Sequence, residues 1–110
     1  MIGDSRPFLL LRSRVRPEAR PRFAEWFREV HLRDVTRIPG IAGVQGATTA
    51  AGTKLGFYSF ESAEVVQSAL SSPEAAYTRG TWEPWSPELE ELSIELFAAL
   101  FPLPIYQSGS

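Results

Sequence analysis

The chain has 110 residues, of which 44% are hydrophobic and 12% aromatic, so we expect one domain with a small core. Its formal net charge of −2 argues against a nucleic-acid-binding protein, since such domains carry a basic excess. The chain has no cysteine, which excludes disulfides, thiolate metal sites and a cysteine nucleophile. No apolar run reaches the ~20 residues of a membrane span, and the N-terminus lacks the layout of a signal peptide. We therefore expect a cytoplasmic protein that binds neither nucleic acid nor membrane.

The first predicted element is a strand over residues 8–15, FLLLRSRV, which follows a flexible leader of residues 1–7. Alternation gives this strand one largely apolar face and a second face that begins apolar and ends basic. The first face carries Leu9, Leu11, Ser13 and Val15, and the second carries Phe8, Leu10, Arg12 and Arg14. The basic end either runs into solvent or lines a polar cavity. We select Arg12 as the cation that faces the cavity and binds substrate.

Charged residues are distributed unevenly along the chain. Arginines crowd the first quarter, at positions 6, 12, 14, 16, 20 and 22, and glutamates crowd the end, at positions 88, 90, 91 and 95. Two explanations stay open. The charges either form two solvated faces of opposite sign, or one or two of the arginines point at an anionic or carbonyl-bearing ligand.

Residues 22–40, RFAEWFREVHLRDVTRIPG, are predicted to form an amphipathic helix. Pro17 or Pro21 suits its first turn, and the proline and glycine at positions 39 and 40 end it. Apolar residues recur along one face at steps of three and four: Phe23, Trp26, Phe27, Val30 and Ile38.

The only histidine of the chain, His31, lies at the edge of this apolar face, and Asp34 lies near its middle. The two are three residues apart, a spacing at which helical side chains can touch. A buried carboxylate costs free energy unless it is paired, and the neighbouring imidazole is the obvious partner. Arg33 and Arg37 are the alternative partners for Asp34.

Residues 41–50 and 54–60 are predicted to form a hairpin through the turn at 51–53. Gly43 and Gly46 interrupt the first of these strands, and glycine inside a strand marks a bulge or a close approach by another group. We expect Val44 and its neighbours to pair with Phe57 and Tyr58. The Tyr58 hydroxyl either donates a hydrogen bond to a ligand oxygen, or the side chain lies in a dimer core.

Two short helices are predicted next, over residues 63–70 and 73–80, the second with Ser72 as its N-cap. An irregular link over residues 81–87 holds Trp82 and Trp85, which either wall a planar substrate or close a small core. The last segment fits a strand and a helix equally well by the spacing of its leucines. We favour a strand over about residues 93–101 after a helical turn near 88–92, and a flexible tail over 105–110.

The element order is therefore β-α-β-β-α-β, which predicts an α+β, ferredoxin-like domain over residues 8–104. Its antiparallel sheet has helices on one face only. The other face carries Phe, Tyr and Leu side chains and needs cover, so a second copy of the chain is the natural lid and a homodimer is expected.

The pattern WFREVHLRDVTRIPGI, with a strand before it and an aromatic strand after it, resembles the dimeric α+β barrel superfamily and in particular its EthD-like small bacterial members. Trp26, His31, Pro39 and Gly40 carry the resemblance, and the run SSPEAAYTRGTWEPW is similar to a set of small bacterial relatives. The resemblance implies a barrel formed by two facing sheets, with one pocket per subunit between sheet and helices. The superfamily includes cofactor-free monooxygenases, polyketide cyclases, isomerases and haem enzymes.

Together these features predict a small cofactor-independent enzyme that acts on an oxygenated, aromatic or polyketide-type small molecule, as a cyclase, isomerase or monooxygenase. His31 would take or relay a proton, Asp34 would orient its ring, and Tyr58 or Arg12 would stabilise the developing oxyanion. The alternative is a non-catalytic dimeric module that binds a small molecule or serves a stress response. No metal and no cofactor are expected, because the carboxylates near His31 do not converge and no glycine-rich phosphate loop is present.

Overall fold

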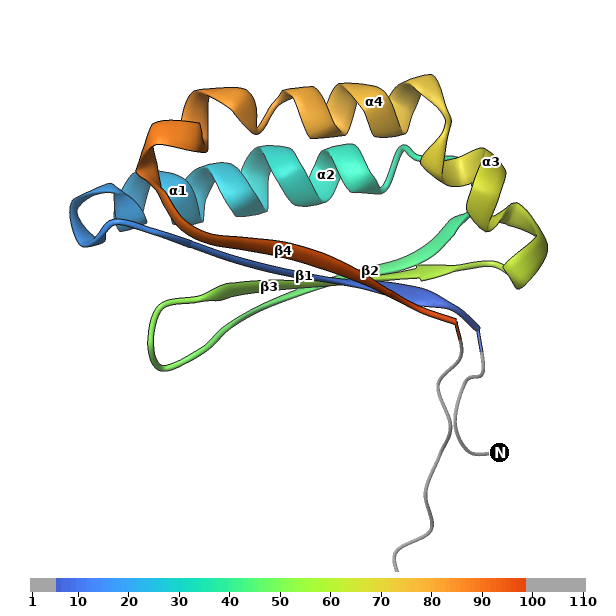
Figure 1. The fold of residues 1–110 in the computed structure, drawn as a ribbon, viewed down its shortest axis with the longest axis horizontal. Helices are drawn as coiled ribbons and strands as arrows, with labels where there is room; N and C mark the ends of the chain where they lie inside the picture. Colours follow the sequence, from blue (N-terminus) through green and yellow to red (C-terminus); the bar gives the residue numbers. More distant parts are fainter. Residues whose placement is uncertain (1–5, 99–110) are drawn as a thin grey trace, which may run out of the picture.

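The computed structural model describes residues 6–98, which form a four-stranded antiparallel sheet with all the helices on one face (Figure 1). The strands are β1 (Phe8–Val15), β2 (Ile41–Thr48), β3 (Lys54–Phe60) and β4 (Leu89–Phe97), in the spatial order β2-β3-β1-β4. This is the predicted ferredoxin-like α+β fold. Residues 1–5 of the expected leader, the expected end of the domain at 104 and the tail over 105–110 lie outside the described residues.

The helical layer consists of a long first helix and a row of shorter ones beside it (Figure 1). The first helix follows a 3-10 turn (Pro17–Ala19) and contains α1 (Arg20–Trp26), a π-helical turn (Phe27–His31) and α2 (Leu32–Val35). The second group contains a 3-10 turn (Ala63–Val65), α3 (Val66–Leu70), α4 (Pro73–Gly80) and a 3-10 turn (Glu83–Glu88). Ser72 caps α4 as predicted, since its Oγ accepts a hydrogen bond from Ala75 N at 3.1 Å.

The hairpin of β2 and β3 has the predicted register, with Val44 opposite Tyr58 and Gln45 opposite Phe57. Both interpretations of glycine in a strand occur in β2. The register shifts between Ile41 and Gly43, which is an irregularity of the bulge type. A Cβ built at Gly46 would lie 2.8 Å from Leu32 Cδ1, so the glycine lets the first helix approach the sheet closely.

The last segment differs from the prediction. Strand β4 begins at Leu89, whereas we expected a helical turn near residues 88–92 and a strand from about residue 93. The helical turn precedes the strand, at Glu83–Glu88. The reason is the length of β1, which pairs with β4 up to Val15 opposite Leu89 and so requires residues 89–92 as its edge partner. Residues 99–101 of the expected strand lie outside the described residues.

The long helix buries Phe23, Phe27 and Asp34 of the predicted face, but the rest of its buried face differs from the prediction. Val30, expected on the buried face, is 37% exposed. Four buried residues recur at four-residue steps, Phe23, Phe27, His31 and Val35, and Asp34 is buried beside them. In the π-helical turn, Leu32 N donates to Phe27 O, five residues back. Because a turn of this kind holds more than 3.6 residues, side chains four apart stay in line instead of drifting around the helix. His31 therefore lies at the centre of the buried face.

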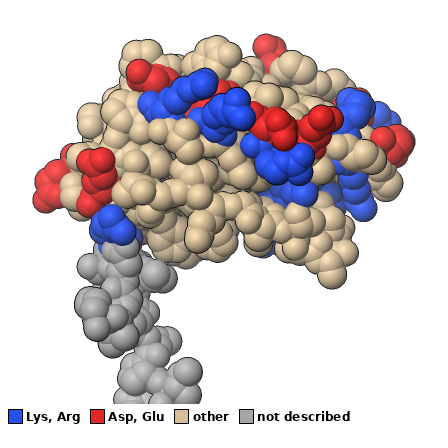
Figure 2. All heavy atoms as spheres, turned by 180° about the vertical axis from the view of Figure 1, so that it is seen from behind, with Lys and Arg blue, Asp and Glu red and all other residues tan. Residues whose placement is uncertain are grey.

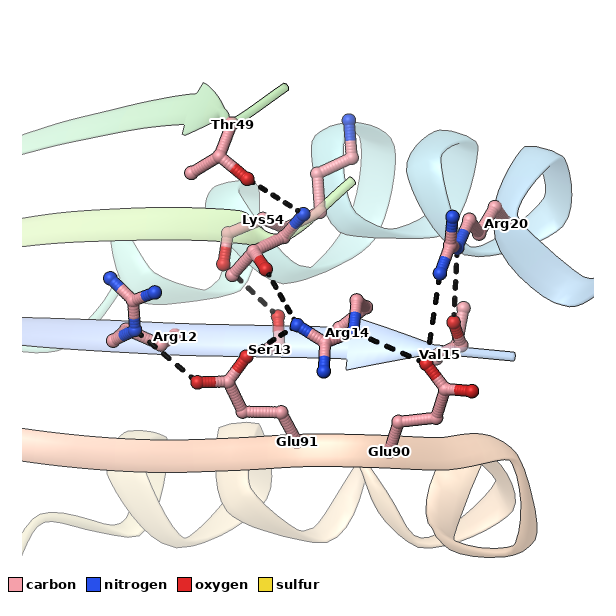
Figure 3. A network of polar contacts seen from close by, with 10 residues as sticks. Arg12, Ser13, Arg14, Val15, Arg20, Thr49, Lys54, Glu90 and Glu91 are labelled. Carbon is pink, nitrogen blue, oxygen red and sulfur yellow. Dashed lines mark hydrogen bonds and ion pairs between the residues drawn. The ribbon is translucent and has the colours of Figure 1, made fainter. Parts of the chain in front are cut away.

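The two charged groups of the sequence meet across β1 and β4 on the face of the sheet opposite the helices (Figure 3). The register shifts between Arg14 and Val15, so both Glu90 and Glu91 reach Arg14, at 3.2 and 3.1 Å. Figure 2 correspondingly shows basic and acidic side chains next to one another and not in separate patches. Partly exposed pairs of this kind add little stability, but they neutralise the two clusters.

Arg12 belongs to this network. Its Nε donates to Glu91 Oε2 at 3.3 Å (Figure 3). Alternation along β1 places Leu10 and Arg14 on the same face as Arg12. Arg12 was expected to face the cavity, but the alternation of β1 places it on the opposite face of the sheet from the helices.

Candidate functional site

The candidate site is a pocket of about 490 Å³ between the helix-facing side of the sheet and the helices. Its floor is apolar, because cross-strand register places Leu9 beside Leu96 and Leu11 beside Ile94. The sheet edge β4 contributes Leu92, Ile94 and Leu96, which are about half exposed. The pocket is therefore open over the edge strand, and its size and apolar wall suit a small organic ligand.

Three polar side chains form a connected row in the wall of this pocket. Trp82 Nε1 donates to His31 Nδ1 at 3.2 Å, and His31 Nε2 lies 2.6 Å from the Tyr58 hydroxyl. All three residues line the pocket and are buried. The row joins the first helix, the inner strand β3 and the segment after α4, which are far apart in the sequence.

The direction of these hydrogen bonds follows from the chemistry of the donors. An indole N–H can only donate, so His31 Nδ1 accepts and carries no proton. A neutral imidazole then carries its proton on Nε2, which donates to the Tyr58 oxygen. The Tyr58 hydroxyl accepts this bond and keeps its own proton for another acceptor. The row is thus a one-way chain of donors that ends at Tyr58.

Burial keeps both ionisable members of this chain neutral. Loss of solvation lowers the pKa of His31 to about 4, so the imidazole is uncharged near neutral pH. The same loss of solvation raises the pKa of the Tyr58 phenol well above its usual value of 10.0. At neutral pH the chain therefore consists of neutral groups in the wall of a largely apolar pocket.

Aromatic rings hold the imidazole in this orientation. Trp26 stacks on His31 with ring centroids 5.7 Å apart, and the Trp82 ring meets it edge-on at 4.9 Å. Phe27, one π-helical turn earlier, lies at 5.0 Å. His31 is 2% exposed as a result. Its ring has little freedom to turn away from either of its hydrogen-bond partners.

Gly56 allows the Tyr58 ring to reach His31. The two residues are on the same face of β3, and a Cβ built at Gly56 would overlap Tyr58 Oη and Cζ. The tyrosine ring therefore lies back along its own strand, over the glycine. Gly56 was not among the residues predicted from the sequence, although its position two residues before an aromatic residue inside an aromatic strand is a recognisable signal.

Asp34 does not join this chain. Its Oδ1 lies 3.4 Å from Arg37 Nη1, the alternative partner named in the sequence analysis, and Oδ2 is buried without a hydrogen-bond partner. Both ring nitrogens of His31 are already engaged by Tyr58 and Trp82. Among residues 6–98, the structure thus brings together His31, Tyr58 and Trp82 of the predicted site residues, and separates Asp34 and Arg12 from them.

Trp85 lies in the core beside the pocket wall. Its ring meets Phe23 edge-on, with centroids 5.0 Å apart, and lies under the Arg22 guanidinium at 5.3 Å. Trp82 lines the pocket, but Trp85 is not part of its wall. Of the two explanations in the sequence analysis, the geometry of Trp85 corresponds to the closing of a small core.

Within residues 6–98, no three histidine, aspartate or glutamate side chains come together in a group that could hold a metal ion. In the same part of the chain, no helix is both long and apolar enough to cross a membrane.

No protein-family model matches this chain, and no curated protein matches it. Several solved structures are similar to it in fold. Rv0793 from Mycobacterium tuberculosis is similar with a TM-score of 0.64 and 17% identity, over 94% of this chain and 100% of that one. An EthD family protein from Bacillus halodurans C-125 has a TM-score of 0.63 and 18% identity, over 81% of this chain and 96% of that one. A variant of SnoaB, a cofactor-independent oxygenase from Streptomyces nogalater, has a TM-score of 0.67 and 15% identity, over 93% of this chain and 100% of that one. These likenesses confirm the expected fold.

The first prediction concerns Gly56. Gly56→Ala forces the Tyr58 ring off its site, so we expect the free energy of unfolding to fall by about 1–3 kcal/mol, the usual cost of overpacking. Denaturant unfolding measures this. Gly80→Ala is the matched control, because a Cβ there meets nothing within 4 Å. In a Tyr58→Leu background the cost of Gly56→Ala should shrink, and an unchanged cost would contradict the account.

The second prediction concerns pH. The native pKa of His31 is about 4 and its ordinary value is 6.5, so between these values the unfolded chain binds a proton that the native chain does not. The free energy of unfolding should therefore be highest above about pH 6.5 and fall by up to about 3 kcal/mol as the pH is lowered towards 4. His31→Gln lacks this contribution. A constant difference between the two proteins from pH 7.5 to pH 4.5 would contradict the assignment.

Proposed function

We propose that this chain is a small cofactor-independent enzyme that binds an oxygenated, aromatic or polyketide-type molecule in the pocket and activates it at a carbonyl or phenol oxygen. The observation that carries the proposal is the Tyr58 hydroxyl, the end of a one-way donor chain in the wall of a largely apolar pocket. The fold is also that of SnoaB, a cofactor-independent oxygenase, which supports an enzymatic role. The cytoplasmic location expected from the sequence stays a prediction.

The chemistry follows from the direction of the chain. Each donor polarises the next one, so the imidazole N–H on the Tyr58 oxygen makes the Tyr58 hydroxyl a better donor than an isolated phenol. A preorganised donor in an apolar site stabilises negative charge that develops on a bound oxygen. A substrate with an acidic phenol or enol would lose its proton more readily there, to solvent water at the open edge of the pocket, because its anion is hydrogen-bonded to Tyr58. Cyclisation, isomerisation and oxygenation all proceed from such an anion.

In this proposal the roles of three residues change from those expected from the sequence. His31 positions and polarises Tyr58 and is not the group that takes the proton from the substrate, because Trp82 occupies its only lone pair. Asp34 has no part in the chemistry, since it faces Arg37. Trp82 sets the tautomer of His31 and holds its ring, whereas Asp34 was expected to orient that ring.

A second candidate function is a non-catalytic module that binds a small molecule in the same pocket. The burial of His31 favours it, because both ring nitrogens are satisfied within the protein and the residue is 2% exposed. The two functions differ in turnover and not in binding.

The test is a screen of quinols and lactones for turnover, followed by Tyr58→Phe on the best substrate. Loss of an oxyanion donor should lower kcat about 100-fold with a smaller effect on KM. Tyr77→Phe is the matched control, because Tyr77 is an exposed tyrosine of α4 outside this pocket. Full activity of Tyr58→Phe would refute the role of Tyr58. Binding without turnover across the screen would favour the second function.

We also propose that the chain forms a homodimer through the face of the sheet opposite the helices. An aromatic patch on this face supports the proposal: the centroid of the Phe8 ring lies 4.7 Å from that of Phe97, which it stacks on, and 5.8 Å from that of Phe57. A hollow of about 490 Å³ beside Phe8 and Phe57 is lined by Gly43 and Ser59. An aromatic patch with a hollow on an uncovered sheet face is a typical self-association surface.

Light scattering at micromolar concentration tests the dimer. The wild-type chain should have twice the mass of one chain, and Phe57→Arg should have the mass of one, because it places a charge in the apolar interface. Val30→Arg is the matched control: Val30 is 37% and Phe57 38% exposed, but Val30 lies on the helical layer. A wild-type monomer, or a Phe57→Arg dimer, would refute this surface.

A further inference from the structure

The pocket that we propose as the active site has one charged group in its wall, Arg79. The other polar residues of the wall are His31, Tyr58, Thr78 and Trp82, and no carboxylate is among the described residues that line it. His31 is neutral at pH 7 because burial lowers its pKa. A ligand that fills the pocket therefore meets apolar surface, neutral donors and one positive charge.

Arg79 also differs from most arginines of the chain in having no carboxylate partner among residues 6–98. Arginines with an acidic partner are Arg12, Arg14, Arg16, Arg20, Arg28 and Arg37. The Arg79 Nη1 donates instead to the Leu70 carbonyl at 3.1 Å, at the end of α3. This bond holds the exposed guanidinium at the rim of the pocket, which Leu70 also lines. Its other donors are available to a ligand.

The position of Arg79 relative to the donor chain follows from the turn that leads out of α4 into the segment that holds Trp82. Trp82 N donates to Arg79 O at 3.2 Å, so the two residues are one helical turn apart, about 5 Å along the axis. Both side chains line the pocket. The pocket thus has two separated polar points, the Tyr58 hydroxyl in its wall beside Trp82 and the Arg79 guanidinium at its rim.

We propose that the ligand of this pocket is a monoanionic carboxylic acid with an apolar body and a second oxygen, bound with its carboxylate on Arg79 and its second oxygen on Tyr58. The inference rests on the proposed function for the placement of that second oxygen. A guanidinium binds a carboxylate by two parallel hydrogen bonds, so a carboxylate fits this rim better than a neutral amide or alcohol.

The experiment measures binding of 6-hydroxy-2-naphthoic acid, a planar apolar acid with a hydroxyl at its far end, by its fluorescence. Its neutral analogue, 6-hydroxy-2-naphthamide, has the same body and hydroxyl. The wild-type chain should bind the acid about tenfold more tightly than the amide, as expected for a charged hydrogen bond. Arg79→Gln should remove most of that preference. Arg33→Gln is the matched control, because Arg33 is an exposed arginine outside the pocket, and it should keep the preference.

Tyr58→Phe separates the inference from the proposed function. It should weaken binding of acid and amide alike and leave their ratio unchanged, since both carry the hydroxyl. Equal binding of acid and amide by the wild-type chain would overturn the role of Arg79, even if Tyr58→Phe weakened both. Loss of the preference in Arg33→Gln to the same extent as in Arg79→Gln, or no binding of the acid at millimolar concentration, would also overturn it.

Discussion

The structure depends on the two hydrogen bonds that the ring nitrogens of one buried histidine make. His31 lies under the rings of Trp26, Phe27 and Trp82, where an unpaired ring nitrogen would cost free energy. Because the Trp82 indole can only donate, the tautomer of the imidazole and the direction of its bond to Tyr58 follow. The π-helical turn aims His31 inward, and Gly56 makes room for the Tyr58 ring. All of these features contribute to the same row of hydrogen bonds from Trp82 through His31 to Tyr58.

The two faces of the sheet carry different kinds of side chain. The face toward the helices carries leucine side chains and the donor chain, and its uncovered edge strand leaves the pocket open. The opposite face has an aromatic end and a charged end. At the charged end, arginines of β1 meet glutamates of β4, so the uneven charge of the sequence cancels within the domain (Figure 3). Arg79 is not part of this charge network; it hydrogen-bonds to the Leu70 carbonyl and lines the pocket.

The sequence predicted local structure better than the site. Alternation and capping residues predicted β1, β3 and α4 to the residue, because these signals act over a few positions. The π-helical turn is invisible to a 3.6-residue period, so Val30 was expected inside and His31 at the edge. Alternation separates the two faces of β1 without saying which one meets the helices, which misplaced Arg12. The bond between His31 and Trp82 joins residues 51 apart, and no local pattern encodes it.

The most direct test of this account is the protonation of His31 by nitrogen-15 NMR at neutral pH, which is unambiguous because the chain has one histidine. The account predicts a neutral imidazole with its proton on Nε2 and none on Nδ1, and no titration above about pH 5, since the pKa is about 4. A proton on Nδ1, or titration near the ordinary value of 6.5, would contradict it. The Tyr58 hydroxyl would then no longer be the end of a one-way donor chain.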